Sequence, residues 1–264
     1  MDKQDAAWQD MKRCLGWDYG AKSKSLVVAS HRREKAQATL EEALSQNRVS
    51  LTKWQSLIGQ LRSLTDGLPG SEGQFSLLQH ALTKQAQGRV RIDDPVRQQL
   101  HTFQDLLNEE NRPIQLEELV AGDPVHIGAC DAAKSGMGGV WFPALGPPLL
   151  WREPFEVNIQ DGVVSQVNRR GDITNSDLEL AGTIGHHAVL ADNASVAGKM
   201  AHTLCNNHTL SVAWRAKGSA TTTKQTAYLL RLAALHRKKQ ICNHQISHIS
   251  GTTTAWQMPA DDGI

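Results

Sequence analysis

The sequence predicts a mixed α/β protein, in which three antiparallel strands and then alternating helices and strands follow a mostly helical N-terminal region. Three observations support this prediction. Apolar residues recur at steps of three and four before residue 110, which is typical of helices. Three short apolar runs separated by glycine- and proline-rich turns follow residue 125. Helix-like and strand-like runs then alternate after residue 175.

Composition sets the outer limits of the protein class. The 264 residues are long enough for one large domain or two ordinary ones, and an apolar fraction of 40% suits a globular protein with a substantial core. The net charge of +1 excludes little. No apolar run approaches membrane-spanning length, and the charged start is unlike a secretion signal, so neither a membrane anchor nor secretion is expected.

The cysteines indicate the redox setting. Cys14, Cys130, Cys205 and Cys242 stand far apart, without a Cys-x-x-Cys pair. This spacing predicts neither a zinc module nor a disulfide framework. A reducing, intracellular location is therefore expected.

The N-terminal region is expected to open with a hairpin and continue as helices. One helix, beginning at Ser50 or Thr52, carries Trp54, Leu57 and Leu61 on a single apolar stripe. The expected elements in order are a hairpin of 14–18 with 25–28 and helices over 31–46, 52–64, 74–87 and 94–107, the last with Asp94 as cap and Pro95 in its first turn.

A break in the pattern divides the chain. Asn111-Arg112-Pro113 ends the helical region, and the segment to residue 124 has the character of a linker. We therefore predict a first region over 1–110, a linker over 111–124 and a second region over 125–264.

Asp131 ends the first strand of the second region. It follows the apolar run from Val125 and precedes a glycine-rich turn, after which 136–142 returns as a second strand and 148–152 forms a third. An aspartate beside buried strand residues needs a cation or hydrogen-bond donors. The alternative is a turn-capping aspartate.

The remaining elements of the second region follow in alternation. Asn175-Ser176-Asp177 supplies caps for a helix with Glu179 in its first turn. A strand around Leu204 ends at Asn206-Asn207. A short helix over 209–217, a longer one over 227–235 and a strand over 246–249 complete the predicted elements.

Charge is distributed unevenly in this second region. Between residues 201 and 250 there is no Asp or Glu, whereas the basic residues and the hydroxyl groups that could bind phosphate are numerous. Such a surface favours a polyanionic partner. The alternative is a set of solvated helix faces whose acidic partners lie elsewhere in the fold. The candidate nucleic-acid-binding residues are Arg215, Lys217, Ser219, Thr221, Lys224, Arg237, Lys238 and Lys239.

Four stretches of the second region resemble, in their order, the ribonuclease H domain of retrotransposon polyproteins. They are residues 131–141, 176–182, 212–219 and 260–262. Residues 15–18 and 51–61 are similar to the end of a reverse transcriptase palm and to its thumb and connection region, so that nearly the whole chain is covered.

The resemblance implies that the chain is the C-terminal part of a reverse transcriptase, with a ribonuclease H-like fold over 125–264 and a thumb/connection-like region over 1–110. No Tyr-x-Asp-Asp motif occurs, so no polymerase activity is expected. A reverse transcriptase palm supplied in trans is a possible partner.

The chemistry that the resemblance implies is metal-assisted hydrolysis of the RNA strand in an RNA–DNA hybrid, by two Mg²⁺ or Mn²⁺ ions held by four acidic residues. The positions that correspond are Asp131, Glu179, Asn207 and Asp261, with Asp262 as a possible substitute for Asp261. His248, on the last strand, is a candidate for proton transfer or product release. A structural histidine is the alternative.

Asn207 departs from the family pattern, because an amide brings no negative charge to a cation. The expected state is therefore a nucleic-acid-binding remnant with one bound ion and impaired hydrolysis. The short stretch that follows Asp261 points the same way. Two alternatives stay open: an active, Mg²⁺-dependent ribonuclease H, and a decayed reading frame or protein-contact module without catalysis.

Overall fold

The chain divides into two compact units in a computed structural model that describes residues 10–109, 113–119, 122–193, 199–206, 224–240 and 243–249. The first unit comprises Met1–Ser71 and His80–Val120, and the second comprises Glu72–Gln79 and Ala121–Ile264. Within the described part of the chain, no helix is both long and apolar enough to cross a bilayer.

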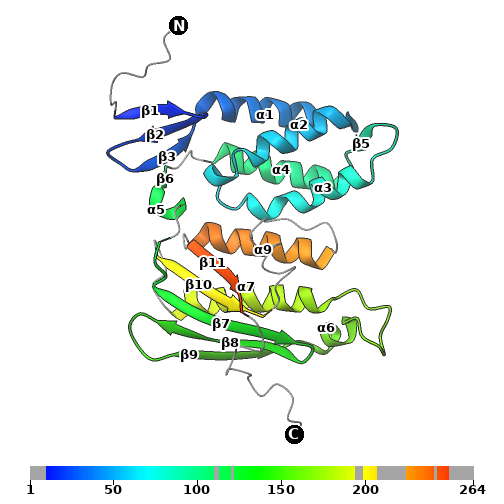
Figure 1. The fold of residues 1–264 in the computed structure, drawn as a ribbon. Coiled ribbons are helices and arrows are strands. Elements are labelled where there is room, and N and C mark those ends of the chain that lie inside the picture. Colours follow the sequence, from blue (N-terminus) through cyan, green and yellow to red (C-terminus); the bar gives the residue numbers. More distant parts are fainter. Residues whose placement is uncertain are drawn as a thin grey trace. The chain divides into compact units, whose positions relative to one another are not determined.

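The first unit combines a small antiparallel sheet with helices (Figure 1). The sheet has the order β1-β2-β3-β6, and a separate two-stranded ribbon is formed by β4 and β5. The elements are β1 (Met11–Cys14), β2 (Trp17–Gly20), β3 (Ser25–Val28), α1 (Ser30–Leu44), β4 (Arg48–Ser50), α2 (Leu51–Arg62), η1 (Thr65–Gly67), η2 (Glu72–Gln74), α3 (Phe75–Thr83), β5 (Arg89–Arg91), α4 (Asp94–Asn108), β6 (Ile114–Gln115) and α5 (Leu116–Leu119), where η2 and the start of α3 are grouped with the second unit.

The apolar stripe predicted for α2 is confirmed. Trp54, Leu57 and Leu61 are buried, and the Ser50 hydroxyl accepts a hydrogen bond from the Lys53 amide at 3.4 Å. Ser50 rather than Thr52 is therefore the cap. In α4, Asp93 takes the capping role that the sequence suggested for Asp94, with its carboxylate accepting from Val96 at 3.2 Å.

Two expectations for this unit need correction. The helix expected over 74–87 ends at Thr83, because Gln87 and Gly88 adopt φ angles of 53° and 68° and turn the chain into β5. The segment 111–124 contains a strand, since Ile114 pairs with Leu26 of β3. Whether the two regions are separate domains with the predicted bounds stays a prediction.

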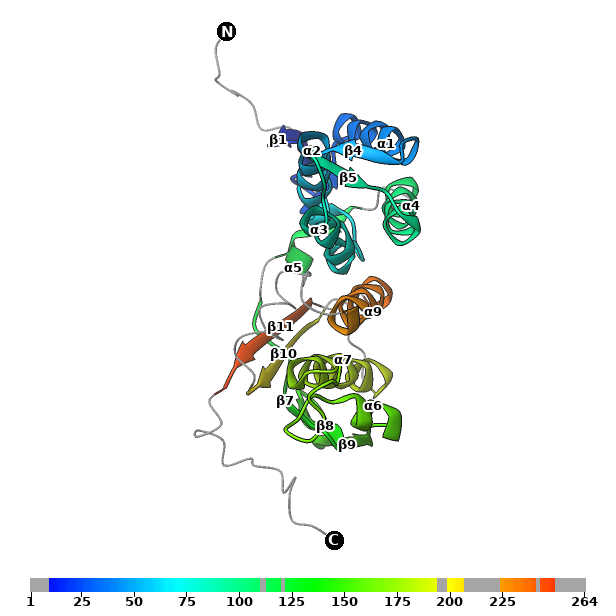
Figure 2. The same cartoon turned by 90° about the vertical axis from the view of Figure 1, so that its right-hand side faces the viewer.

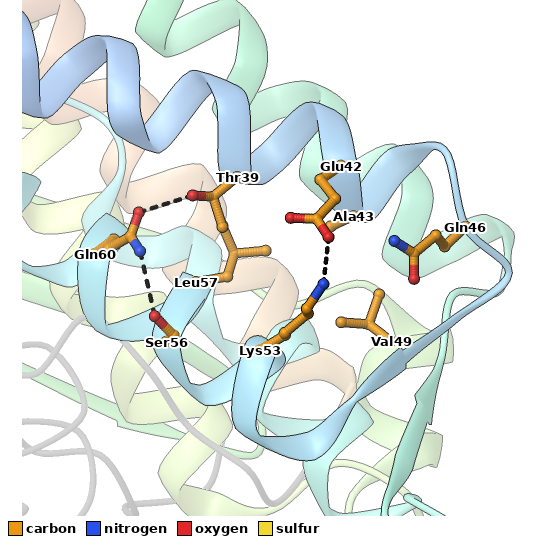
Figure 3. A pocket seen from close by; sticks show the side chains of 9 residues that line it. All are labelled: Thr39, Glu42, Ala43, Gln46, Val49, Lys53, Ser56, Leu57 and Gln60. Carbon is orange, nitrogen blue, oxygen red and sulfur yellow. Dashed lines mark hydrogen bonds and ion pairs between the residues drawn. The ribbon is translucent and has the colours of Figure 1, made fainter.

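A groove of ≈ 200 Å³ lies between α1 and α2 (Figure 3). Its polar side chains bond to one another: Lys53 pairs with Glu42, and Gln60 links Thr39 to Ser56 at 3.1 and 3.2 Å. Lys53 also lowers the pKa of the Glu42 carboxyl. The Lys53–Glu42 and Thr39–Gln60 interactions link α1 to α2, so these polar side chains have a structural role. Its lining is Thr39, Glu42, Ala43, Gln46, Val49, Lys53, Ser56, Leu57 and Gln60.

The second unit is built on one five-stranded sheet with the order β11-β10-β7-β8-β9. The strands β7, β8 and β9 are antiparallel neighbours, whereas β10 runs parallel to β7 and β11 parallel to β10. The elements are β7 (His126–Ala133), β8 (Gly136–Pro143), β9 (Leu149–Pro154), α6 (Val157–Gly162), α7 (Asn175–Asn193), β10 (Met200–Cys205), α9 (Lys224–Gln240) and β11 (Asn243–His248). The predicted order of three antiparallel strands and then alternating helix and strand is confirmed, and α6 was not predicted.

The helices α7 and α9 lie on the same side of this sheet (Figure 2). Leu180 and Ile184 of α7 pack against Leu230 and Ala233 of α9. On β7 every second residue is buried, and these are His126, Gly128, Cys130 and Ala132. The alternation follows from the period of two in a strand with one covered face.

A histidine occupies the centre of the core between α7 and the sheet. His186 is fully buried and stacks on Trp141, with ring centroids 3.9 Å apart. The Trp151 indole N–H donates to His186 Nδ1 at 2.8 Å. Two glycines make room for the ring. A Cβ on Gly128 would lie 2.5 Å from Nε2 of His186, and a Cβ on Gly139 would lie 2.7 Å from its Nδ1. Burial lowers the pKa of His186 to about 3, so the ring is neutral at physiological pH.

Candidate functional site

Asp131 lies on β7 and is exposed, whereas its neighbours Cys130 and Ala132 are buried. One carboxylate oxygen accepts a hydrogen bond from the Ala132 amide at 2.9 Å. The strand pairing places Asp131 opposite Gly138 of β8, which has no side chain to cover it.

Glu179 reaches the site from the start of α7. A reciprocal cap begins this helix: the Asp177 carboxylate accepts from the Thr174 amide at 2.8 Å, and the Thr174 hydroxyl accepts from the Asp177 amide at 3.3 Å. The Thr226 hydroxyl of α9 also donates to Asp177. The first turns of α7 are therefore held firmly, and Glu179 is buried two residues after the cap.

Removing the buried cap should loosen the start of α7. We expect Asp177→Ala to lower the free energy of unfolding by about 2 kcal/mol, because the donors of Thr174 and Thr226 lose a charged acceptor. Urea unfolding measures the change. The control is Asp172→Ala, which removes an exposed bond from Gln225 and should cost less than about 1 kcal/mol. Equal losses in the two variants would contradict the role of Asp177.

The structure brings Asp131 and Glu179 together. Burial, the negative charge of Asp131 and a hydrogen bond between the two carboxyl groups raise the pKa of Glu179 to about 8, although a bond from the Ala132 amide opposes this. At neutral pH the Glu179 carboxyl therefore holds a proton. A divalent cation would replace that proton. Hard divalent ions bind carboxylate oxygens, and the positive charge of the ion would offset the repulsion between the two carboxylates.

Two cysteines adjoin this pair and were not predicted as neighbours of the site. Leu204 of β10 pairs with Ala129 of β7, so the next residues, Cys205 and Cys130, are neighbours on the covered face. Burial, and then the nearby Cys205, Glu179 and Asp131, raise the pKa of the Cys130 thiol. The Cys130 thiol is therefore protonated and unreactive in this environment.

Arg152 is a second residue near the site that the sequence reading missed. Gly138 pairs with Asp131 on one side and with Arg152 of β9 on the other, so the three residues form one row across the sheet. Arg152 is exposed. The alternating positions of Leu149 to Arg152 could have shown on which face of β9 Arg152 lies. The register that aligns Arg152 with Asp131 depends on the tertiary structure.

The other predicted site residues are only partly described. His248 lies on β11 opposite Cys205, two strands from β7, and is exposed. Lys224 is the exposed first residue of α9. Arg237, Lys238 and Lys239 belong to the last turn of α9, but their side chains are outside the described part. Asn207, Arg215, Lys217, Ser219, Thr221, Asp261 and Asp262 lie outside the described residues.

Within the described part, no three His, Cys, Asp or Glu side chains form a group that could hold a metal ion. The described site is thus the carboxyl pair of Asp131 and Glu179. The strand β10 ends at Cys205, and Asn206 is the last residue of this segment that the structure describes.

The strand order, the mixed directions of the strands and the helix that carries Glu179 give the second unit the mixed α/β fold that the sequence predicted. No family model and no curated protein matches the chain.

Solved structures with weak similarity include two structures of one viral enzyme and one structure of an archaeal enzyme. The foamy viral protease-reverse transcriptase bound to RNA/DNA hybrid is 10% identical over 96% of this chain and 31% of that chain, with a TM-score of 0.38. The same enzyme bound to dsDNA is 12% identical over 91% and 45%, with a TM-score of 0.38. RNase H1 from the halophilic archaeon Halobacterium salinarum is 14% identical over 48% and 87%, with a TM-score of 0.35. The chain thus spans less than half of the viral chains.

Proposed function

We propose that this chain is a reverse transcriptase-derived fragment that binds nucleic acid, in particular an RNA–DNA hybrid, through its ribonuclease H-like unit. The observation that carries the proposal is the meeting of Asp131 and Glu179, one from the first strand and one from the first long helix of that unit. The proposal has three further parts. The first unit has a thumb/connection-like role, the protein is intracellular, and a palm is supplied in trans.

The carboxyl pair suits Mg²⁺ or Mn²⁺, which when bound would activate a water and stabilise the leaving oxygen of a phosphodiester. Asp131, which is exposed, and Glu179, which is buried, would together hold the ion. Lys224 and the other basic residues after Asn206 would bind the phosphates of the hybrid.

Hydrolysis is proposed to be impaired by Asn207. Its amide can offer a carbonyl oxygen but no charge, and a site with one charge fewer holds two divalent ions less well. The alternative function is an active ribonuclease H that tolerates Asn207. A decayed reading frame or protein-contact module without catalysis is the second alternative, and the contact between Asp131 and Glu179 argues against it.

The test is cleavage of a labelled RNA–DNA hybrid in Mg²⁺ and in Mn²⁺ by the full chain. We expect little cleavage by the parent, a gain in Asn207→Asp on the order of 100-fold, and loss of that gain in Asn207→Asp with Asp131→Asn. Binding of the same hybrid is measured in parallel in EDTA.

Each other outcome decides between the candidates. If the parent cleaves and Asp131→Asn abolishes cleavage, the protein is an active ribonuclease H. If no variant cleaves but the parent binds the hybrid in a salt-dependent manner, only the binding part of the proposal stands. If the parent neither binds nor cleaves, the proposal is wrong.

A further inference from the structure

The ribbon of β4 and β5 in the first unit carries three arginines on one face. Arg48 stands directly opposite Arg91 in the antiparallel ladder, and Arg89 stands opposite Ser50. All three arginines are exposed. Between them, Val49 and Val90 point to the other face and are buried, so the two faces of the ribbon are fully segregated.

These arginines lack the acidic partners that other basic residues of this unit have. Arg13 pairs with Asp18, and Lys22 pairs with Asp10. Lys53, which follows the ribbon by three residues, pairs with Glu42. Within the described residues, no hydrogen bond or ion pair engages the side chain of Arg48, Arg89 or Arg91. Among the described residues, the ribbon face therefore carries three guanidinium groups that form no ion pair.

The arrangement is unfavourable for the free protein. Like charges directly opposite each other in an antiparallel pair repel and weaken the pairing. A ribbon held by only three residue pairs has little other stabilisation, apart from Val49 and Val90 beneath it. A bound polyanion would offset the repulsion between the arginines, because each guanidinium can donate two hydrogen bonds to a phosphate.

We propose that the Arg48–Arg89–Arg91 face is a second nucleic-acid-binding surface that contacts the phosphate backbone and is separate from the carboxyl pair. The proposal rests on the proposed nucleic-acid binding of the chain, but it concerns the other unit. The ribbon face has Ser50 as its only further side chain and no exposed apolar or aromatic residue. This favours phosphates of a nucleic acid over a membrane surface, where basic residues usually accompany apolar ones that insert.

The experiment compares the parent with Arg48→Gln/Arg91→Gln in the full chain. The probe is a fluorescent 20-base-pair RNA–DNA hybrid, titrated at several salt concentrations in EDTA. We expect roughly tenfold weaker binding and a slope of log affinity against log salt that is smaller by about two, because two phosphate contacts are lost. The matched control, Lys22→Gln/Lys35→Gln, removes the same charge from the first unit outside the ribbon and should bind within about twofold of the parent.

A second readout separates binding from folding. The double arginine variant should have a melting temperature equal to or above that of the parent, since it removes a repulsive pair. Weaker binding together with a lower melting temperature would overturn the proposal in favour of a structural role. Parent-like affinity and salt slope would also overturn it. Parent-like binding of the hybrid with lost binding of phosphatidylserine vesicles would identify a membrane as the partner instead.

The outcomes also distinguish this proposal from the function proposed for the second unit. If Lys224→Gln weakens binding and the ribbon variant does not, the ribbon proposal alone fails. If the ribbon variant weakens binding and Asp131→Asn with Asn207→Asp leaves cleavage unaffected, the carboxyl site fails and the ribbon stands. A parent that binds no hybrid contradicts both.

Discussion

Glu179→Gln is expected to make the protein more stable than the parent at alkaline pH. The pKa of Glu179 is about 8 in the folded chain against an ordinary value of 4.5, so between these values the folded state binds a proton that the unfolded state has lost. The stability of the parent therefore falls as pH rises from 4.5 to 8. The difference corresponds to on the order of 5 kcal/mol above pH 8.

The variant should not show this loss, because a glutamine is neutral at every pH and can donate its amide to Asp131. At pH 4.5 the two proteins should be about equally stable. The measurement is the free energy of unfolding in urea across pH 4.5 to 9. If the free energy of unfolding changes with pH in the same way in parent and variant, the raised pKa of Glu179 is contradicted.

Magnesium provides an internal control for the same pair. At pH 8, added Mg²⁺ should stabilise the parent by replacing the proton, whereas the variant should respond little. Asp131→Asn should recover only part of the lost stability, since burial contributes more to the raised pKa of Glu179 than the charge of Asp131 does. A full response to Mg²⁺ in Glu179→Gln would place the ion elsewhere.

Acid is expected to destabilise the second unit through His186. The pKa of this histidine is about 3 in the folded chain and 6.5 ordinarily, so below pH 6.5 the unfolded state takes up a proton that the folded state refuses. The contribution is fully present above pH 6.5 and is lost as pH falls. The loss corresponds to about 2 kcal/mol at pH 5 and on the order of 4 kcal/mol at pH 3.5.

His186→Asn removes the titrating ring but leaves an amide oxygen that can accept from Trp151. This variant should be less stable than the parent at pH 7, because the stacking on Trp141 is lost, but its stability should decline less between pH 6.5 and 5. Tryptophan fluorescence follows the transition. His202→Asn, on the uncovered side of β10, is the matched control. A parent-like decline in His186→Asn would assign the acid sensitivity to other groups.

Local chemistry in the sequence was sufficient for most of the elements. The steps of three and four in α2 and α4, the alternation in β7 and the cap residues before α7 each predict one element from neighbours along the chain. The failures were also local: the helix expected over 74–87 continues only to Thr83, because Gln87 and Gly88 adopt a turn that competes with helix formation. β6, with two residues, is too short to be recognised without its partner β3.

Asp131 drew attention from the sequence as an aspartate at the expected end of an apolar strand, whereas Glu179 was named only through the resemblance to ribonuclease H. The raised pKa of Glu179 could not be predicted, because it depends on how deeply α7 buries Glu179 and on the distance across to β7. Likewise, Cys205 and Arg152 join the neighbourhood of the site only through strand register, which a sequence does not specify directly.

The sequence by itself determined the fold class, the order of the elements and the types of side chain available for chemistry, because these depend on periodicity and on local hydrogen bonding. The tertiary structure decided which charges meet. It placed Asp131 beside Glu179 and raised a carboxyl pKa, enclosed His186 between two tryptophans, and set Arg48 opposite Arg91 without an acidic partner in the described residues. Electrostatic energies depend on distance and burial, and both are properties of the packed chain.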